Sequence, residues 1–298
     1  MATLIDFRRR IRSVKNTQQI TRAMKFIAAA RLRRAQERVL ASRPYAQQIL
    51  RVLRSASKRM EQVAHPLLAV RPEERILLVV IAADRGLCGA FNTNVLRKAA
   101  EFLRANRERK VQVVAVGKRV SDALRRIRMP ALAEMTNVTM NVKFSHAKEL
   151  ADLIIDLYVK AEVDAVYFVL NEFKNVMVQR VVTARLLPIP PEVVAAPQQE
   201  SASQVAPGRE LAEVDYIYQQ PPQEIFEHLM PRYVEAEILR GLLESSAAEH
   251  AARMTAMDAA TNNAADLIES LTLHMNKVRQ AAITKEIIEV VSGAASAG

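Results

Sequence analysis

The segment from Ala82 to Asn92 contains the first residues of the chain that could bind a phosphate. It reads Ala-Ala-Asp-Arg-Gly-Leu-Cys-Gly-Ala-Phe-Asn, follows a β-rich run and precedes a predicted helix, the position at which doubly wound folds hold phosphates. The segment lacks the three-glycine spacing of a dinucleotide loop and the Gly-Lys-Ser/Thr of a phosphate loop. The Gly117-Lys118 pair after a second β-rich run is a weaker signal still. We therefore expect a structural turn or a protein-contact loop here, and no cofactor.

Residue types used in catalysis are present but are not grouped. Cys88, the single cysteine, lies near Arg85, whose charge would favour a thiolate, but no histidine is close in sequence to act as a base. We expect Cys88 to be a buried spectator. The five histidines show no metal-ligand spacing; they are His65, His146, His228, His250 and His274. No pair of carboxylates stands out, so the sequence predicts neither hydrolytic nor redox catalysis.

The net charge of +11 is concentrated in one segment. Residues 1–60 carry sixteen Lys and Arg against Asp6 and Glu37. Cationic helices bind nucleic acids or anionic membranes, but this segment has few aromatic side chains for base stacking. From the residues alone three interpretations stay open: a solvated basic face, a nucleic-acid-binding helix, and a basic shaft inside an acidic cavity.

The remaining composition limits the class of protein. Half of the residues are apolar, which suffices for a core, but no apolar run reaches the eighteen or so residues of a membrane span. The N-terminal residues resemble no signal peptide, and one cysteine fits a reducing cytoplasm. Scarce glycine and absent tryptophan favour helix over a glycine-turned β protein.

The C-terminal segment, from Gln223 to Val291, predicts one very long helix. Small or apolar residues recur at steps of four and three, the heptad pattern that presents one stripe to a partner helix. The stripe comprises Leu243, Ala247, His250, Met254, Met257, Thr261, Ala264, Ile268, Leu271, Met275, Val278 and Ala282. The helix would be roughly 100 Å long, too long for a compact domain, so it must protrude and be covered.

The N-terminal segment, from Leu4 to about Met60, predicts a second long helix. Its heptad positions are Leu4, Phe7, Ile11 and Val14, then Ala28, Leu32, Ala35 and Val39, with an interruption at Gln18 and Thr21. Both helices leave from the domain between them, so a pair of them would be antiparallel. The C-terminal helix is longer by a tip of roughly 20 Å. That tip, Ile283 to Val291, is apolar around its circumference and calls for an external sleeve.

Strands and helices alternate between the two long helices. The predicted strands are 75–81, 110–116, 164–170, 176–187 and 214–218, and the predicted helices are 92–106, 118–127 and 146–160. The expected fold class is α/β: a central Rossmann-like domain plus a long antiparallel coiled coil of the terminal helices. We expect shaft helices over residues 1–60 and 221–298, and a globular domain over 61–220 with an exposed loop at 190–210.

Several motifs resemble those of the γ subunit of F-type ATP synthase. They are Arg12–Met24 and Ala28–Gln36, Asp84–Gly89 followed by Phe91-Asn92, Glu249–Met254, Ala259–Asn263, and Asn276–Glu286. The pattern Ile283-Thr284-x-Glu286-x-x-Glu289-x-x-x-Gly293-Ala294-x-Ser296 fits the family at each fixed position, whereas Ala90 stands where a second glycine is usual. The resemblance covers the whole chain and is strongest in the two end helices.

The resemblance implies a central-stalk rotor subunit that couples ion-driven rotation of a membrane c ring to conformational cycling of the catalytic β subunits. It implies no active site and no cofactor of its own. The implied partners are the α and β subunits of the catalytic hexamer, the ε subunit and the c ring, with one copy per complex and neither a nucleic acid nor a small-molecule substrate. The absence of a transit peptide favours a bacterial member, peripheral on the cytoplasmic face of the plasma membrane. A basic coiled-coil nucleic-acid-binding protein is the alternative.

Family position and charge together suggest contact residues. Those expected to face the catalytic hexamer are Met24, Arg33, Arg34, Arg85, Cys88, Arg253, Arg279, Gln280, Thr284 and Glu286, and those expected near the c ring and ε are Tyr216 and Tyr218. Met24 is expected opposite a region that includes Arg253 and residues 279–286. We expect the cations to meet acidic segments of the β subunits.

Overall fold

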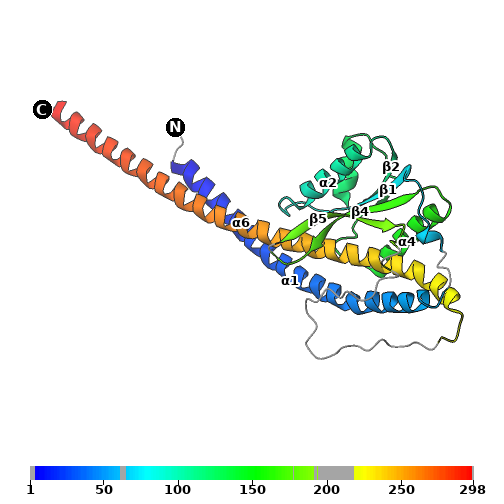
Figure 1. Cartoon of the computed structure of the whole chain (residues 1–298). Coiled ribbons are helices and arrows are strands. Elements are labelled where there is room, and N and C mark those ends of the chain that lie inside the picture. The colour runs from blue at the N-terminus through cyan, green and yellow to red at the C-terminus, as the bar shows by residue number, and fades with distance from the viewer. Residues whose placement is uncertain (1–3, 61–64, 177, 191–192, 194–217, 297–298) are drawn as a thin grey trace. The chain divides into compact units, whose positions relative to one another are not determined.

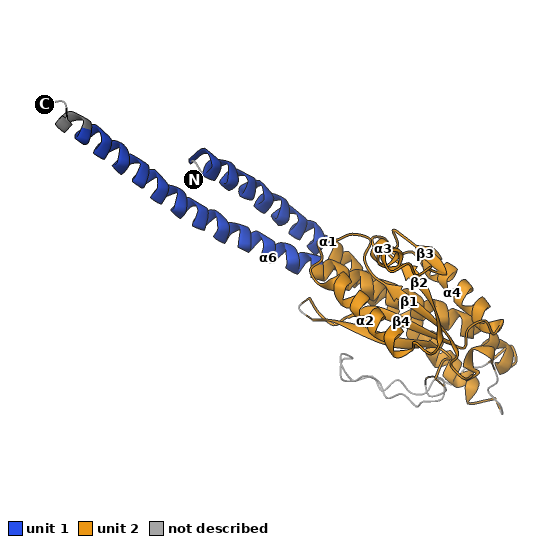
Figure 2. Ribbon diagram, turned by 90° about the horizontal axis from the view of Figure 1, so that it is seen from above, with its two compact units in different colours: residues 1–30, 253–298 blue, residues 31–252 orange. Residues whose placement is uncertain are grey.

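The computed structural model describes residues 4–60, 65–176, 178–190, 193 and 218–296, and it divides into two compact units. Unit 1 comprises residues 1–30 and 253–298, and unit 2 comprises residues 31–252 (Figure 2). Two helices contribute to both units: α1 (Leu4–Ser57) has 54 residues and α6 (Pro222–Ser296) has 75. The predicted long terminal helices are therefore confirmed.

Unit 2 is built on a five-stranded sheet with the order β3-β2-β1-β4-β5. The strands are β1 (Arg75–Ile81), β2 (Lys110–Val116), β3 (Ala133–Met135), β4 (Ala165–Phe173) and β5 (Gln179–Leu187). β1 pairs in parallel with β2 and β4, β2 pairs in parallel with β3, and β5 is antiparallel to β4. β1 is central, and its residues after Arg75 are all buried, which explains the continuous apolar run there.

Helices cover both faces of this sheet. α2 (Phe91–Ala105) and α3 (Lys118–Arg126) pack on one face around a core that includes Leu78 and Val80. α4 (Phe144–Val159) and the unit-2 part of α6 lie on the other side of the sheet (Figure 1). A one-turn 3-10 helix, η1 (Pro66–Leu68), precedes β1. These layers confirm the predicted α/β fold class.

Unit 1 is an antiparallel pair formed by the first part of α1 and the last part of α6 (Figures 1 and 2). The ring centres of Phe7 and His274 lie 5.1 Å apart, and Lys25 pairs with Asp258. Residue numbers therefore rise along α1 in the direction in which they fall along α6. Along the predicted stripe, Met257 and Ala264 are buried. The remaining stripe members in this unit are half-buried: Met254, Thr261, Ile268, Leu271, Met275, Val278 and Ala282.

The structure departs from the expectations in two places, and a third expectation lies almost wholly outside the described residues. The sequence does not predict β3, because three residues are too few to show a period. The expected strand at 214–218 lies outside the described residues except for Tyr218, which belongs to no strand. In unit 2, α6 is buried on several sides instead of along one stripe, because the sheet lies against it. At Gly241 the helix comes close to the sheet, since an added Cβ would lie 3.1 Å from the side chain of Leu170.

Candidate functional site

The loop after β1 is held in place by hydrogen bonds to the carboxylate of Asp84, which is part of the loop. Asp84 is buried, and its Oδ1 accepts hydrogen bonds from the backbone N–H of Lys118 at 3.0 Å and of Asn137 at 2.8 Å. Its Oδ2 accepts a hydrogen bond from the Thr139 hydroxyl at 3.2 Å. A phosphate at this edge of the sheet would use the same N–H groups at the start of α3. The Asp84 carboxylate occupies that position and would repel a second anion, which favours the structural turn over a phosphate site.

Cys88 lies on the inner side of the same loop. It is buried and packs against Ala83 and against Ala248 of α6. The Asn92 amide donates hydrogen bonds to Cys88 Sγ at 3.2 Å and to the Arg85 carbonyl at 3.3 Å, and its oxygen accepts one from the Ala83 N–H. The prediction of a buried cysteine is confirmed. Its expected role as a partner contact is corrected, because the side chain faces α6 and not the surface.

The outer face of the loop is formed by Arg85 and Leu87, which are both exposed. Leu87 has φ 61°, in the left-handed region that residues other than glycine seldom adopt. Beside it lies a cavity of about 260 Å³ whose lining includes Arg119 and Arg126 of α3. This face combines an apolar side chain with several cations, a composition suited to contact with another protein.

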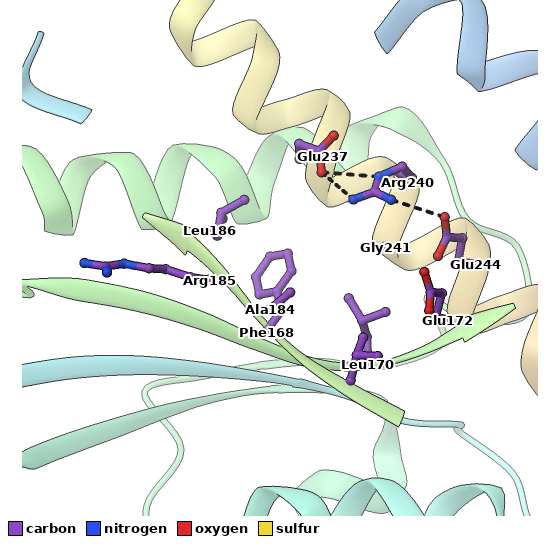
Figure 3. A pocket seen from close by; sticks show the side chains of 11 residues that line it. Phe168, Leu170, Glu172, Ala184, Arg185, Leu186, Glu237, Arg240, Gly241 and Glu244 are labelled. Atoms are coloured by element: carbon purple, nitrogen blue, oxygen red, sulfur yellow. Dashed lines mark hydrogen bonds and ion pairs between the residues drawn. The ribbon is translucent and has the colours of Figure 1, made fainter. Parts of the chain in front are cut away.

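A second groove lies between α6 and the β4–β5 face of the sheet (Figure 3). It encloses about 170 Å³, and Phe168 and Leu170 are among the side chains that form its apolar wall. On α6, the Arg240 guanidinium bridges Glu237 at 2.6 Å and Glu244 at 3.5 Å. Burial raises the pKa of the Glu244 carboxyl. On the α6 side of the groove, the charges of Glu237, Arg240 and Glu244 therefore pair with one another within the helix.

Three of the predicted contact residues lie on α1. Met24 is half-buried in the helix pair, whereas Arg33 and Arg34 are exposed. Arg33 Nε lies 3.2 Å from Glu37 Oε1, one turn away, and both side chains are largely exposed. Such surface pairs contribute little to stability, so the pair leaves Arg33 able to exchange Glu37 for an acidic group of another protein.

Four more predicted contact residues lie near the end of α6. Arg279, Gln280, Thr284 and Glu286 are all exposed, and the Thr284 hydroxyl donates a hydrogen bond to the Gln280 carbonyl at 3.0 Å. They share the helix surface with exposed apolar residues: Ile283 (49%), Ile287 (57%), Ile288 (58%), Val290 (72%) and Val291 (61%). The predicted apolar tip is therefore exposed within the described chain.

The pairing in unit 1 corrects the expected position of Met24. Its neighbour Lys25 contacts Asp258, with Nζ and Oδ1 2.6 Å apart, so Met24 lies near the level of Arg253. Arg279 is roughly 30 Å farther along α6 than Asp258, at 1.5 Å per residue. Met24 therefore does not lie opposite residues 279–286.

Of the two tyrosines expected near the c ring, Tyr218 lies within the described residues. Tyr218 is half-buried, and the Arg59 guanidinium lies 4.8 Å from the centre of its ring. Tyr216 lies outside the described residues. The structure thus gives an environment for Tyr218 alone.

Two further properties concern only the part of the chain that the structure describes. No group of His, Cys, Asp and Glu side chains there could hold a metal ion. None of the described helices combines the length and the hydropathy that a membrane span needs.

Sequence comparison places the chain in a family. A sequence model of the family described as ATP synthase matches residues 3–297. The ATP synthase gamma chain of Solibacter usitatus is 48% identical over 301 residues, with 100% of both chains covered. The chain belongs to the ATP synthase gamma-chain family. The gamma chain of Pelotomaculum thermopropionicum is 44% identical, with 99% of both chains covered.

Solved structures of ATP synthases contain chains with a similar fold. One chain of the central stalk and c ring of the Tetrahymena thermophila mitochondrial ATP synthase is 25% identical, with a TM-score of 0.57 over 81% of this chain and 99% of that one. A chain of the Euglena gracilis mitochondrial ATP synthase is 18% identical, with a TM-score of 0.64 over 98% of this chain and 94% of that one. The predicted role as a gamma chain, a central-stalk rotor subunit, is confirmed, and the nucleic-acid alternative is not supported.

Proposed function

We propose that this gamma-family chain transmits rotation between a membrane c ring and catalytic β subunits, and that it has no active site of its own. The observation that carries the proposal is the end of α6, where Ile283, Ile287 and Ile288 are all exposed. A helix with apolar side chains around its circumference is stable in water only when other protein covers it. We infer that a ring of α and β subunits is this cover.

The shape of unit 1 suits the transmission of rotation. A single helix pair has no threefold symmetry, so within a ring of three β subunits it contacts each one differently. A ligand shifts a conformational equilibrium only by the difference between its contacts in the two states. Unequal contacts around one shaft can therefore hold the three β subunits in different states, and turning the shaft exchanges those states.

The exposed cations are the proposed contacts with acidic segments of the β subunits. They include Arg33 and Arg34 on α1 and Arg85 in the loop after β1. Further proposed contacts with the hexamer are Met24, Arg253, Arg279, Gln280, Thr284 and Glu286.

The remaining part of the proposal concerns the globular domain, the shaft and the place of the complex in the cell. Residues 61–220 would rest on the c ring and the ε subunit, with Tyr216 and Tyr218 near that contact, while residues 1–60 and 221–298 form the shaft. One copy per complex would act at the cytoplasmic face of a bacterial plasma membrane.

Assembly is the first test of this function. The tagged chain, purified from bacterial membranes, should carry α, β, ε and c subunits with it and should not retain polynucleotide at moderate salt. A chain recovered alone as a compact monomer, or one that binds polynucleotide with a steep dependence on salt, would contradict the proposal.

The tip provides a sharper test with a matched control. Ile287→Asp with Ile288→Asp places two charges where we infer an apolar sleeve, and should reduce ATP-driven proton pumping by inverted membrane vesicles. Ile127→Asp changes an equally exposed isoleucine at the end of α3 and should leave pumping near the unmodified level. Equal pumping by both variants would rule out the sleeve.

The cationic contacts are tested by charge reversal. Arg33→Glu with Arg34→Glu should weaken coupling between ATP hydrolysis and pumping at low salt, and less so at high salt because salt screens surface charges. Met24→Lys adds a cation next to Lys25 and should impair coupling more than assembly, whereas Met24→Leu keeps the apolar side chain. An unchanged ratio of protons pumped to ATP hydrolysed in both charge variants would count against these contacts.

A further inference from the structure

Between residues 20 and 30, α1 has two apolar sides. On the buried side Ala28 is 1% exposed, and on the outer side Ile20 is 60% and Ile27 is 54% exposed. Ile27 precedes Ala28 directly, so their side chains differ by one step of about 100° around the helix. A rotation of α1 by about 100° about its own axis would exchange Ala28 for Ile27 against α6. Burial of apolar surface alone would favour the larger isoleucine, so another interaction must select the observed side.

A polar layer lies in the helix pair at this level. Thr21 is 8% exposed, and its hydroxyl oxygen lies 2.8 Å from that of Thr261. Each hydroxyl also lies within hydrogen-bond distance of a carbonyl of its own helix, at 3.0 Å from Gln18 for Thr21 and at 2.7 Å from Met257 for Thr261. The Gln18 side-chain amide lies 3.5 Å from the Thr261 carbonyl. The contacts of Thr21 and Gln18 with Thr261 join the two helices and require the observed side of α1 to face α6.

An ion pair lies one helical turn away from the polar layer. Lys25 Nζ is 2.6 Å from Asp258 Oδ1, and both side chains are partly exposed. Exposed pairs add little stability, but like charges brought together cost free energy. The pair joins α1 to α6 in the observed packing, and a like charge placed at either position would oppose that packing.

On each helix of unit 1, the residues spaced by seven that include the threonine of this layer are otherwise apolar. The row on α1 is Phe7, Val14, Thr21 and Ala28, and the row on α6 is Met254, Thr261, Ile268 and Met275. Sliding one helix by a heptad would bring Thr261 against Val14 or Ala28. Either position breaks the hydrogen bond between the two hydroxyls and leaves each with the carbonyl of its own helix alone, which is unfavourable in an apolar seam. A single buried polar residue is known to fix register in coiled coils.

We propose that Thr21, Thr261, Lys25 and Asp258 are positioning residues that select the side of α1 and the register with which it packs on α6. They keep Ile20 and Ile27 on the outside of the pair. The packing role stands on the contacts of unit 1 alone. Its consequence for rotation, namely that the outer apolar side stays available to a partner, rests on the proposed function.

The packing role is tested in the isolated full-length chain by maleimide labelling of single introduced cysteines. With the polar layer intact, Ile27→Cys should react roughly tenfold or more faster than Ala28→Cys, because buried thiols react only through local opening. The buried Cys88 is present in every variant and reports unfolding. Adding Thr21→Val with Thr261→Val should raise the labelling of residue 28 and lower that of residue 27.

Two controls make the experiment decisive. Thr21→Ser with Thr261→Ser retains both hydroxyls and should retain the original ratio of rates. Lys25→Asp should shift the ratio in the same direction as the valine pair, and the swap Lys25→Asp with Asp258→Lys should restore it; these variants decide the question if the valine pair does not fold. An original ratio in the valine pair, or in Lys25→Asp, would overturn the proposal.

Coupling in the assembled complex separates this inference from the proposed function. The valine pair should lower proton pumping relative to ATP hydrolysis while leaving the thermal stability of the chain unchanged or higher, since apolar replacement of a polar layer is often stabilising. A changed labelling ratio with normal coupling would support the packing layer and contradict its role in rotation. An unchanged labelling ratio would contradict the packing layer and leave the rotor function standing.

Discussion

Residues 222–252 and 253–296 of α6 belong to one helix, yet they bury their side chains in different ways. In the unit-2 part, residues 245–251 are buried without interruption. In the unit-1 part, among the described side chains, Met257 and Ala264 alone are buried, and every side chain from Ile283 to Ser292 is exposed. The same secondary structure is thus a core element in unit 2 and is exposed all round at its end, where we propose that other proteins cover it.

The difference follows from what each part packs against. In unit 2 the sheet lies along α6, and Gly241 lets the helix approach Leu170 closely. In unit 1 one partner helix covers one stripe, which is all that a helix pair can bury. Substitutions in unit 2 should therefore change the stability of the chain, and substitutions at the end of α6 should change what the chain does in a complex.

The largest effect is expected at Gly117, in the turn between β2 and α3. This residue has φ 98°, and an added Cβ would lie 2.0 Å from the carbonyl oxygen of Ala82. The obstacle is backbone in the central strand layer and cannot move aside, so Gly117→Ala should prevent unit 2 from folding. Loss of the cooperative urea transition, followed by circular dichroism, would show this.

Gly86→Ala is the matched control for that change. A Cβ at Gly86 would meet the end of the Arg119 side chain at 2.9 Å, and a flexible side chain can move at little cost. The urea transition should stay close to the original. A Gly117→Ala protein that folds with the original urea midpoint would show that the backbone around this turn can move to accept a Cβ.

A large but smaller effect is expected from Ile238→Ala. Ile238 lies in the unit-2 part of α6 and is 0% exposed. Removing it from a packed core should lower the free energy of unfolding by about 2–5 kcal/mol. Urea or guanidinium unfolding measures this. A loss below about 0.5 kcal/mol, typical of surface positions, would erase the distinction between the two parts of the helix.

The sequence predicts some features of each unit because they are local. β1 and β2 agree residue for residue with the predicted strands 75–81 and 110–116, since a charged residue marks the start of each apolar run. The unit-1 stripe is also predicted, because a heptad period is a property of one helix. The continuous burial of residues 245–251 is not predicted, because serine, glutamate and histidine give no apolar signal. Their burial comes from distant segments of unit 2: Ser245 meets Asn171 of β4, and Ser246 donates a hydrogen bond to the Thr139 carbonyl.

The candidate sites show the same limit. The sequence places the loop around Asp84 at the edge of the sheet, but the partners of this carboxylate, Lys118 and Thr139, lie 34 and 55 residues away. Which N–H groups it meets depends on the strand order, which one sequence does not reveal. The prediction that Met24 lies opposite residues 279–286 is wrong, and the reason is similar. The register of two helices is set by contacts such as Lys25 with Asp258, and neither helix contains that information alone.

A moderate, pH-dependent effect is expected in unit 2 from Asp164. Its carboxylate accepts hydrogen bonds from the Arg75 guanidinium at 2.7 Å and from the Arg75 N–H at 2.8 Å, and Arg75 lowers the pKa of Asp164. A carboxyl with a lowered pKa in the folded state stabilises the fold above its unfolded pKa, about 3.9. This stabilisation is lost as the pH falls below that value through the folded pKa.

Asp164→Asn should therefore reduce the loss of unfolding free energy between about pH 5 and pH 3, and should lower stability at neutral pH. Urea unfolding at a series of pH values measures both effects. Unit 1 provides the comparison, since Lys25 and Asp258 form a partly exposed pair, and Asp258→Asn should lower stability at neutral pH much less than Asp164→Asn. Equal changes in the two variants would mean that burial does not distinguish these ion pairs.

The smallest effect on stability is expected from Ile288→Ala, the counterpart of Ile238→Ala in the same helix. Ile288 is 58% exposed, so its loss should change the free energy of unfolding of the isolated chain by less than about 0.5 kcal/mol. In the complex the order should reverse. Ile288→Ala removes apolar surface that we propose lies inside the sleeve, so it should reduce proton pumping per ATP although the chain itself is as stable as before. A variant that loses stability without losing coupling would show that the end of α6 is covered by its own chain. Since the two substitutions delete the same atoms from the same helix, any difference between them reports the surroundings and not the helix itself.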